Sequence, residues 1–207
     1  MGALFVPADR ATELALDCAK RQALRASLPE DGPRLELRRV RRSDSALLAD
    51  FVAALSPQSR RRRFHSGLHT LPPAWLEYLL NPDPVAEYAL LAVESDGDRS
   101  TCVGEARYAR SDEATDAREF AIVVADGWQG QGVGSRLLRL LGCHAHSQGV
   151  ARLYGDVLRD NVPMLGTAQR VGYSLRRHPS DATLVRVERA LDSALPAGAE
   201  FADSATH

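Results

Sequence analysis

The chain has 207 residues, of which 44% are hydrophobic and 26% are charged, as is usual for a soluble globular protein. A formal net charge of −1 excludes a global field that attracts nucleic acid or an anionic membrane, and no apolar run approaches the ~20 residues of a membrane span. The three cysteines are far apart and form no C-x-x-C pair, which argues against a disulfide framework or a zinc ribbon and indicates small core residues in a reducing, cytoplasmic compartment.

The N-terminal part of the chain is expected to lie outside the main domain. Apolar residues at helical spacing predict a helix over residues 9–27, and residues 29–33 then form a Pro- and Gly-containing linker. The sequence therefore divides into a helical extension and linker (residues 1–33), a domain (residues 34–191) and a mobile tail rich in small residues (residues 192–207).

Within the domain, a strand at residues 34–40 precedes three helical segments. Ser43 or Asp44 is expected to cap a helix that runs to Leu55, and Ser56-Pro57 is a good start for a second helix. The third segment is residues 73–80. The elements expected after it are strands 86–94 and 101–110 with a turn at 95–98, strand 118–125, helix 133–147, strand 152–158, helix 161–171, and strands 173–177 and 183–189. This order predicts one α/β domain, a twisted mixed sheet flanked by helices.

Four glycines, Gly127, Gly130, Gly132 and Gly134, follow strand 118–125, three in the loop and the fourth in the first turn of the helix that starts at Val133. Glycine allows a close backbone approach to a bulky anion, and N–H groups at a helix N-terminus form a phosphate cradle. The loop lacks the Gly-Lys-Ser/Thr of a Walker A motif, and Ser135 stands where a G-x-G-x-x-G fingerprint that starts at Gly130 needs glycine. The segment predicts a phosphate site of another kind, the alternative being a plain glycine turn.

The remaining pattern is Gln-x-x-Gly-x-Gly, formed by Gln129, Gly132 and Gly134. Here the sequence resembles the GNAT superfamily, whose signature holds the pyrophosphate of acyl-CoA, and the resemblance extends over about residues 34–191. It implies a GNAT fold with splayed central strands and acetyl-CoA as co-substrate. The cofactor-binding residues that it implies are Ile122, Val123, Val124, Gln129, Gly130, Gln131, Gly132, Val133, Gly134, Ser135, Arg136 and Asn161.

The sequence more closely resembles the acetyltransferase domain of bacterial protein lysine acetyltransferases of the Pat type. This likeness rests on residues 55–60 with Arg63-Phe64, on residues 118–124 and 128–134, and on residues 161–165 with Gly172-Tyr173. It implies that the acceptor is a lysine side chain of a cytoplasmic protein such as an acyl-CoA synthetase. Two alternatives stay open, a small-molecule amine acetyltransferase and a non-catalytic acetyl-CoA-binding regulatory module. Monomer and homodimer also stay open.

Glu119 is the candidate catalytic residue. It shares a strand face with Ala121 and Val123, in a segment apolar enough to be central and buried. Because a buried carboxylate without a partner is costly, Glu119 is expected either to pair or to have a function. By resemblance it has the position of the general base of Pat-type enzymes, and the alternative is an ion pair with Arg118 or another arginine.

Asn161 precedes a predicted helix, which it is expected to cap, and by resemblance it also contacts the pantetheine arm near the thioester. Many GNAT enzymes carry a tyrosine seven residues after this asparagine as general acid, but here Ala168 stands at that position. The resemblance therefore leaves the acid unassigned. An acid is dispensable if the thiol, with a pKa of ~8.5, leaves as thiolate.

Four consecutive arginines, residues 60–63, predict a solvated helix face, and the functional alternative is a docking patch for an acidic protein surface. His144 and His146 are two residues apart on a helix and so cannot share a metal ion, and His65 and His69 lack a third ligand. No metal site is expected.

Overall fold

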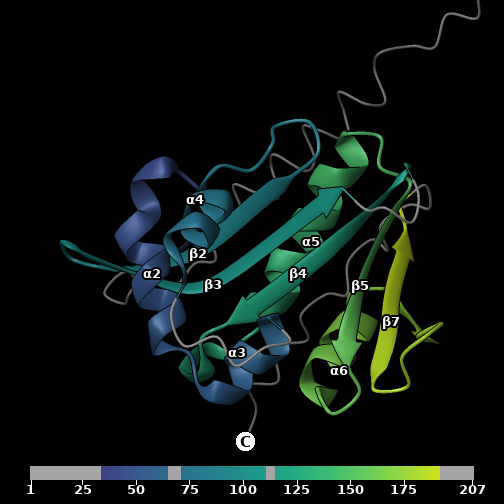
Figure 1. The fold of residues 1–207 in the computed structure, drawn as a ribbon. Helices are drawn as coiled ribbons and strands as arrows, with labels where there is room; N and C mark the ends of the chain where they lie inside the picture. Colours follow the sequence, from purple (N-terminus) through teal and green to yellow (C-terminus); the bar gives the residue numbers. More distant parts are fainter. Residues whose placement is uncertain (1–33, 65–70, 111–114, 192–207) are drawn as a thin grey trace, which may run out of the picture.

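The computed structural model describes residues 34–64, 71–110 and 115–191, which form a seven-stranded mixed sheet with helices on both faces (Figure 1). The strand order is β1-β2-β3-β4-β5-β7-β6, and only the β4–β5 pair is parallel. The α/β class and the mixed sheet predicted from the sequence are confirmed. The predicted N-terminal helix and C-terminal tail lie outside the described residues.

The elements follow the predicted order closely. The strands are β1 (Arg34–Arg39), β2 (Tyr88–Asp96), β3 (Arg99–Arg110), β4 (Ala117–Val124), β5 (Arg152–Leu158), β6 (Ser174–Arg177) and β7 (Leu184–Ala190). The helices are α2 (Ser45–Ala54), α3 (Pro57–Phe64), α4 (Pro73–Leu80), α5 (Val133–Ser147) and α6 (Val162–Arg170), with short 3-10 helices η1 (Arg42–Asp44) and η2 (Asp126–Trp128). None of the helices in the described part is long and apolar enough to cross a membrane.

Asp44 precedes α2 as predicted, but its side chain does not cap that helix. Its carboxylate instead accepts hydrogen bonds from Arg38, at 2.7 Å to each oxygen, and from the Arg41 backbone N–H at 2.7 Å. The bond from Arg38 is the main cause that holds the pKa of Asp44 below its usual value. Asp44 therefore ties the start of α2 to strand β1.

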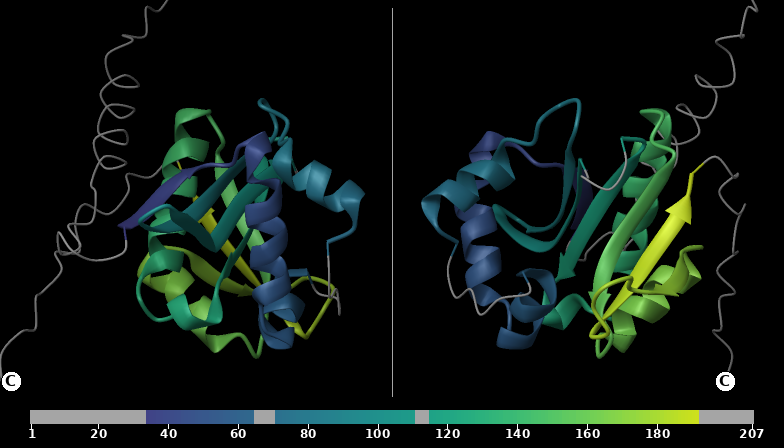
Figure 2. Two further views of the ribbon diagram at one scale, coloured as in Figure 1. Left: turned by 90° about the vertical axis from the view of Figure 1, so that its left-hand side faces the viewer. Right: turned by 45° about the vertical axis from the view of Figure 1, so that its right-hand side comes forward.

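Two apolar cores pack on opposite faces of the sheet. Helices α5 and α6 cover one face, and α2 to α4 cover the β1–β4 part of the other face (Figure 2). Four large apolar side chains of α5, Val133, Leu137, Leu138 and Leu141, are buried, and the burial of each contributes about 1.5–3 kcal/mol to folding. The first core includes Val133, Leu137, Leu138 and Leu141 with Tyr88, Leu90 and Phe120, and the second includes Leu48, Phe51, Val52 and Leu79 with Leu91 and Val123.

Strands β4 and β5 separate soon after they meet. Their parallel register contains three pairs and ends at Glu119 and Tyr154, although both strands continue beyond those residues. At the point of separation Gly155 lies against Phe120, and a Cβ atom on Gly155 would be 2.8 Å from the Phe120 carbonyl oxygen. A glycine is therefore needed here, and the predicted splay of the central strands is present.

Candidate active site

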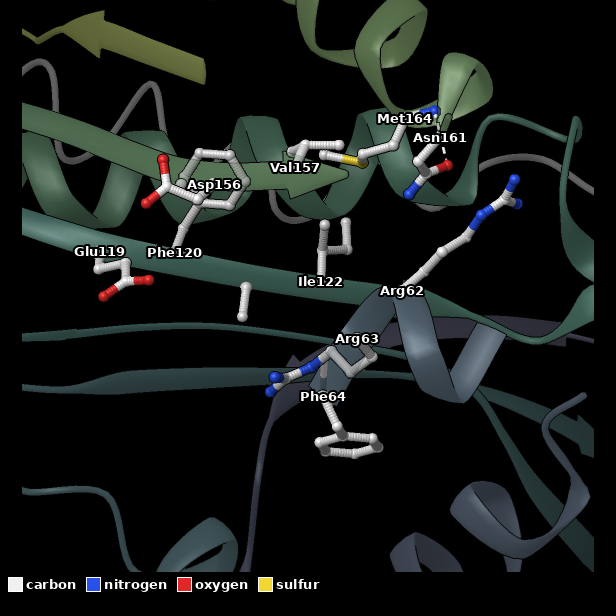
Figure 3. A pocket seen from close by; sticks show the side chains of 12 residues that line it. Arg62, Arg63, Phe64, Glu119, Phe120, Ile122, Asp156, Val157, Asn161 and Met164 are labelled. Carbon is white, nitrogen blue, oxygen red and sulfur yellow. Dashed lines mark hydrogen bonds between the residues drawn. The ribbon is translucent and has the colours of Figure 1, made fainter. Parts of the chain in front are cut away.

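A pocket occupies the gap between β4 and β5. Residues 119–122 of β4 and residues 155–157 of β5 form two of its walls, and Asn161 and Met164 close it from α6 (Figure 3). Residues 62–64 of α3 line it as well. The splay of the sheet thus brings Glu119 and Asn161, 42 positions apart in the sequence, into one pocket.

The glycine loop turns from η2 directly into helix α5. Gly130 and Gly132 have φ values of 78° and 81°, the left-handed region that glycine adopts without strain, and Gly132 is the N-cap residue of α5. The first N–H groups of the helix, including those of Val133, Gly134 and Ser135, have no intrahelical acceptor. Together with the helix dipole, these groups are suited to bind a phosphate.

Gln129 holds this loop through two hydrogen bonds of its side chain. Its side-chain amide donates to Val124 O at 3.0 Å and to Ser59 Oγ at 3.2 Å. Nearby, Asp126 accepts hydrogen bonds from Ser56 N, Ser56 Oγ and Ser59 Oγ at 2.8–3.0 Å. Burial opposes ionisation of Asp126, but these bonds hold the pKa of its carboxyl below the usual value. The side chain of Gln129 therefore positions the loop, and its neighbours Gly130 and Gln131 are exposed.

The backbone N–H and C=O groups of successive β4 residues point alternately to the two sides of the strand. Ala125 N donates to Val103 O at 2.8 Å, so the residues in step with Ala125, including Val123, direct their backbone groups toward β3. Ile122 and Val124 direct theirs to the opposite side, toward the gap beside β5. Of the three strand residues implied to bind the pantetheine arm, Ile122 and Val124 therefore have the suitable backbone orientation, whereas the Val123 side chain is buried in the second core.

Glu119 lines the pocket, but the prediction that it is buried is wrong, because its side chain is exposed. Strand periodicity correctly assigned its face, yet β4 loses its neighbour at this residue, and in the close view the carboxylate lies on the side of β4 away from β5 (Figure 3). Glu119 therefore does not carry the cost of a buried charge. Glu119 lies at the edge of the gap, where an acceptor can reach it, and this accessibility supports its candidate role as general base.

Asn161 caps α6 as predicted, since its Oδ1 accepts from Met164 N at 3.4 Å. In the close view its side chain lies beside the pocket opposite Ile122 (Figure 3). Ala168 is fully buried in the first core, so this position offers no proton donor to the pocket.

The four arginines of α3 do not form one solvated face. Arg60 donates to the carbonyl groups of Ala53 and Leu55 at the end of α2, and Arg61 is exposed and lies 3.9 Å from Asp160. Arg63 points the other way, toward the sheet. The predicted solvated face is therefore correct for Arg61 and wrong for Arg63.

Arg63 belongs to a buried ion cluster with Glu105 and Arg107. Glu105 Oε2 accepts from Arg63 at 3.1–3.2 Å, and Oε1 accepts from Arg107 Nε at 2.9 Å. Burial disfavours the charge on Glu105, but the two arginines hold the pKa of its carboxyl below the usual value. This cluster was not predicted from the sequence, although Glu105 and Arg107, two charged residues inside the central part of β3, were a usable signal.

A second carboxylate, Asp156, also lines the pocket and was missed from the sequence. Arg186 donates to its two oxygens at 2.5 and 3.1 Å, and His178 Nε2 lies 3.2 Å from Oδ2. Because His178 Nδ1 accepts from the N–H of Asp181 at 2.9 Å, the ring proton is on Nε2, which donates to Asp156. Asp156 is thus fixed in place on the β5 wall.

A family model described as the acetyltransferase (GNAT) family matches residues 50–173. The match spans Glu119, the glycine loop and Asn161. An acetyltransferase of Pseudomonas aeruginosa is 30% identical to this chain over 156 residues, which are 75% of this chain and 83% of that protein.

Two further similarities concern proteins called Pat. Acetyltransferase Pat of Mycolicibacterium smegmatis is 32% identical over 117 residues, 56% of this chain, and the chain spans about a third (34%) of that protein's length. The GNAT domain of S. lividans PAT, a solved structure, has a TM-score of 0.69 at 26% identity and covers 77% of this chain and 92% of that domain.

Proposed function

Because the chain belongs to the acetyltransferase (GNAT) family and is an acetyltransferase that uses acetyl-CoA, we propose that its acceptor is a lysine side chain of a cytoplasmic protein, such as an acyl-CoA synthetase. The observation that carries the proposal is the pocket between β4 and β5, which joins Glu119, Asn161 and α3 where the central strands of the sheet separate. The likeness to the GNAT domain of S. lividans PAT supports a Pat-type acceptor.

The residues around the gap fit acetyl-CoA. The N–H groups of residues 133–135 are suited to the pyrophosphate, with Arg136 and the exposed residues 130–132 beside them. The backbone groups of Ile122 and Val124 and the side chain of Asn161 are suited to the pantetheine arm. When bound there, acetyl-CoA supplies the thioester carbonyl that an amine attacks.

Glu119 acts as the general base in this proposal. A lysine ammonium has a pKa of ~10.4, so the neutral amine costs roughly 4–5 kcal/mol at pH 7. The carboxylate accepts the ammonium proton directly or through one water, while the N–H groups of β4 that face the gap polarise the carbonyl oxygen. The exposed position of Glu119 suits a lysine that enters from solvent.

A small polyamine or another small cationic amine is the second candidate acceptor. The observation that favours it is the second carboxylate, because Asp156 and Glu119 line the same pocket from opposite walls. Two arginines, Arg62 and Arg63, line it too, and Asp156 is already paired with Arg186, so the pocket is not strongly acidic. This balance supports the protein acceptor over the polyamine.

The test is to incubate the purified protein with acetyl-CoA and either an acyl-CoA synthetase or spermidine, and to measure the products by mass spectrometry. We expect acetyl-lysine on the synthetase, at a rate well above that of the reaction without the protein. Comparative lysine-acetyl proteomics of cells with and without the protein then identifies the natural acceptor. Acetylation of spermidine with no acetyl-lysine on any protein would refute the protein acceptor.

A further inference from the structure

Arg62 lines the pocket, and its charge has no carboxylate partner within the described residues. Arg61 has Asp160 and Arg63 has Glu105, whereas Arg62 reaches only a backbone carbonyl, that of Asp160, at 3.4 Å. The Nε atom of Arg62 is buried and has no hydrogen-bond partner in the described part of the chain. Such a group carries a desolvation cost that a bound anion would offset.

In the close view the side chain of Arg62 extends from α3 toward the start of α6, at the Asn161 end of the pocket (Figure 3). The other charges that line the pocket are either compensated or lie elsewhere on its wall. Arg63 is paired with Glu105, Asp156 is paired with Arg186, and Glu119 lies toward the opposite end of the labelled β4 segment in the close view. Arg62 is therefore the uncompensated cation at the Asn161 end of the pocket.

This end of the pocket is where the site needs a group for the leaving thiol. Ala168 is buried and offers no hydroxyl, so the fold supplies no proton donor from that position of α6. A thiolate that leaves near Asn161 would meet the Arg62 guanidinium instead. We propose that Arg62 is a catalytic residue that stabilises the leaving thiolate by direct charge–charge contact, which removes the need for a general acid.

The step balances without a further reagent. The amine nitrogen forms a bond to the thioester carbon, the C–S bond breaks, and its electron pair leaves on sulfur. Glu119 passes the ammonium proton to solvent and then takes the proton that the attacking amine loses, and the thiolate keeps its negative charge beside Arg62 until it diffuses into solvent. The inference rests on the proposed position of the pantetheine arm at Asn161 and not on the identity of the acceptor.

The direct test is a titration of the thiol of coenzyme A bound to the protein, followed by the ultraviolet absorbance of the thiolate. A free thiol has a pKa of ~8.5, and a cation in contact lowers it by about one unit or more. We expect this lowering in the wild-type protein, its loss in Arg62→Gln and its retention in Arg62→Lys. Arg61→Gln is the matched control, because it removes the same charge from the next residue of the helix and should leave the thiol pKa unchanged.

Turnover supplies the second readout. Arg62→Gln should lower kcat for acetyl transfer about tenfold or more with little change in the KM for acetyl-CoA. Arg61→Gln should leave both kcat and the KM for acetyl-CoA unchanged. Weaker coenzyme A binding by Arg62→Gln with an unchanged thiol pKa would overturn the proposal and assign Arg62 to cofactor binding. If wild-type protein acetylates no protein acceptor, the proposed acceptor fails, but the thiol titration still decides the role of Arg62.

Discussion

Arg63 of α3 and Glu105 of β3 form a buried ion pair with 3.1 Å between Nη2 and Oε2. Their side chains are 10% and 6% exposed, so water screens the pair little. The pair fixes α3 to the sheet, and α3 carries three of the residues that line the pocket. A contact outside the reacting atoms thus controls the shape of the candidate active site.

Replacing Glu105 should destabilise the protein strongly. Glu105→Gln keeps the size of the side chain but leaves Arg63 and Arg107 without their shared counter-charge, and breaking a buried pair in this way costs about 3–5 kcal/mol. Urea denaturation measures the change in the free energy of unfolding. Arg61→Gln, which removes an exposed charge, should change it by less than about 0.5 kcal/mol. Equal effects of the two changes would show that the cluster does not anchor α3.

Gly134→Glu should abolish binding of acetyl-CoA. A Cβ atom at Gly134 meets its nearest neighbours at 3.7–3.9 Å, so the fold has room for it, but the added charge would lie at the helix N-terminus where phosphate is expected. Gly132 is less suitable for this test because its φ of 81° strains any other residue. Isothermal calorimetry measures the affinity for acetyl-CoA. Gly127→Glu is the control, because a Cβ atom at Gly127 also has open space around it. If Gly134→Glu left the affinity for acetyl-CoA unchanged, the phosphate groups of acetyl-CoA would not bind at this loop.

Glu119→Gln should leave acetyl-CoA affinity unchanged and lower kcat by ~10²–10⁴ at neutral pH. Because Glu119 is exposed, the substitution is expected to leave the fold intact. The activity of the variant should partly recover at high pH, where the acceptor amine deprotonates by itself. Steady-state kinetics across a pH series measures both effects, and near wild-type kcat at neutral pH would assign the base to another group.

His144 should make the protein sensitive to acid. Burial, with a smaller effect of Arg39, lowers the pKa of His144 to about 4 from 6.5, and its Nδ1 lies 2.8 Å from Tyr108 Oη. Since the folded-state pKa is below the unfolded value, this contribution to stability is present above pH 6.5 and is lost as the pH falls toward 4. Allowing for the part of the ring that water reaches, the loss should be about 2 kcal/mol.

The variant His144→Gln keeps a hydrogen-bond acceptor for Tyr108 and removes the titration. The free energy of unfolding, measured by denaturant at several pH values, should therefore fall less steeply between pH 6.5 and 4 in the variant than in the wild-type protein. Parallel curves for the two proteins would show that His144 does not titrate in this range.

Tyr173→Phe should leave stability unchanged or raise it slightly. The Tyr173 hydroxyl is buried in the first core with no hydrogen-bond partner among the described residues, and burial raises its pKa. Removing an unsatisfied buried hydroxyl relieves a desolvation cost, which is of the order of 1 kcal/mol. Tyr108→Phe is the matched comparison, because it deletes the bond to His144 and should lower stability by about 1 kcal/mol. A clear destabilisation by Tyr173→Phe would mean that the hydroxyl has a partner.

Most of the fold followed from the sequence because local signals were strong. The period-2 pattern of β4, the apolar stripe of α5 and the turn at Gly97 each depend on residues close together in the chain. The glycine loop was recognised for the same reason, since its residues are consecutive. These parts of the site required no knowledge of what packs against them.

The missed features depend on partners that are distant in sequence. Periodicity gave the face of Glu119 but not its exposure, because exposure depends on where β5 separates from β4. Arg63 read as one of four surface arginines, since its partner Glu105 lies 42 positions away. Asp156 was missed for the same reason, because its partners Arg186 and His178 come from the β6–β7 hairpin.

The short β4–β5 seam has a consequence for local unfolding. Three residue pairs join the antiparallel strands β1–β4 to the antiparallel strands β5, β7 and β6, so few backbone hydrogen bonds couple the two parts of the sheet. Regions that share so few backbone hydrogen bonds can open as separate cooperative units, with amide protons that exchange at different rates. A molecule lodged between β4 and β5 would touch both units, and its presence should slow amide exchange in both at once, so that the sheet opens as one unit when occupied and as two when empty.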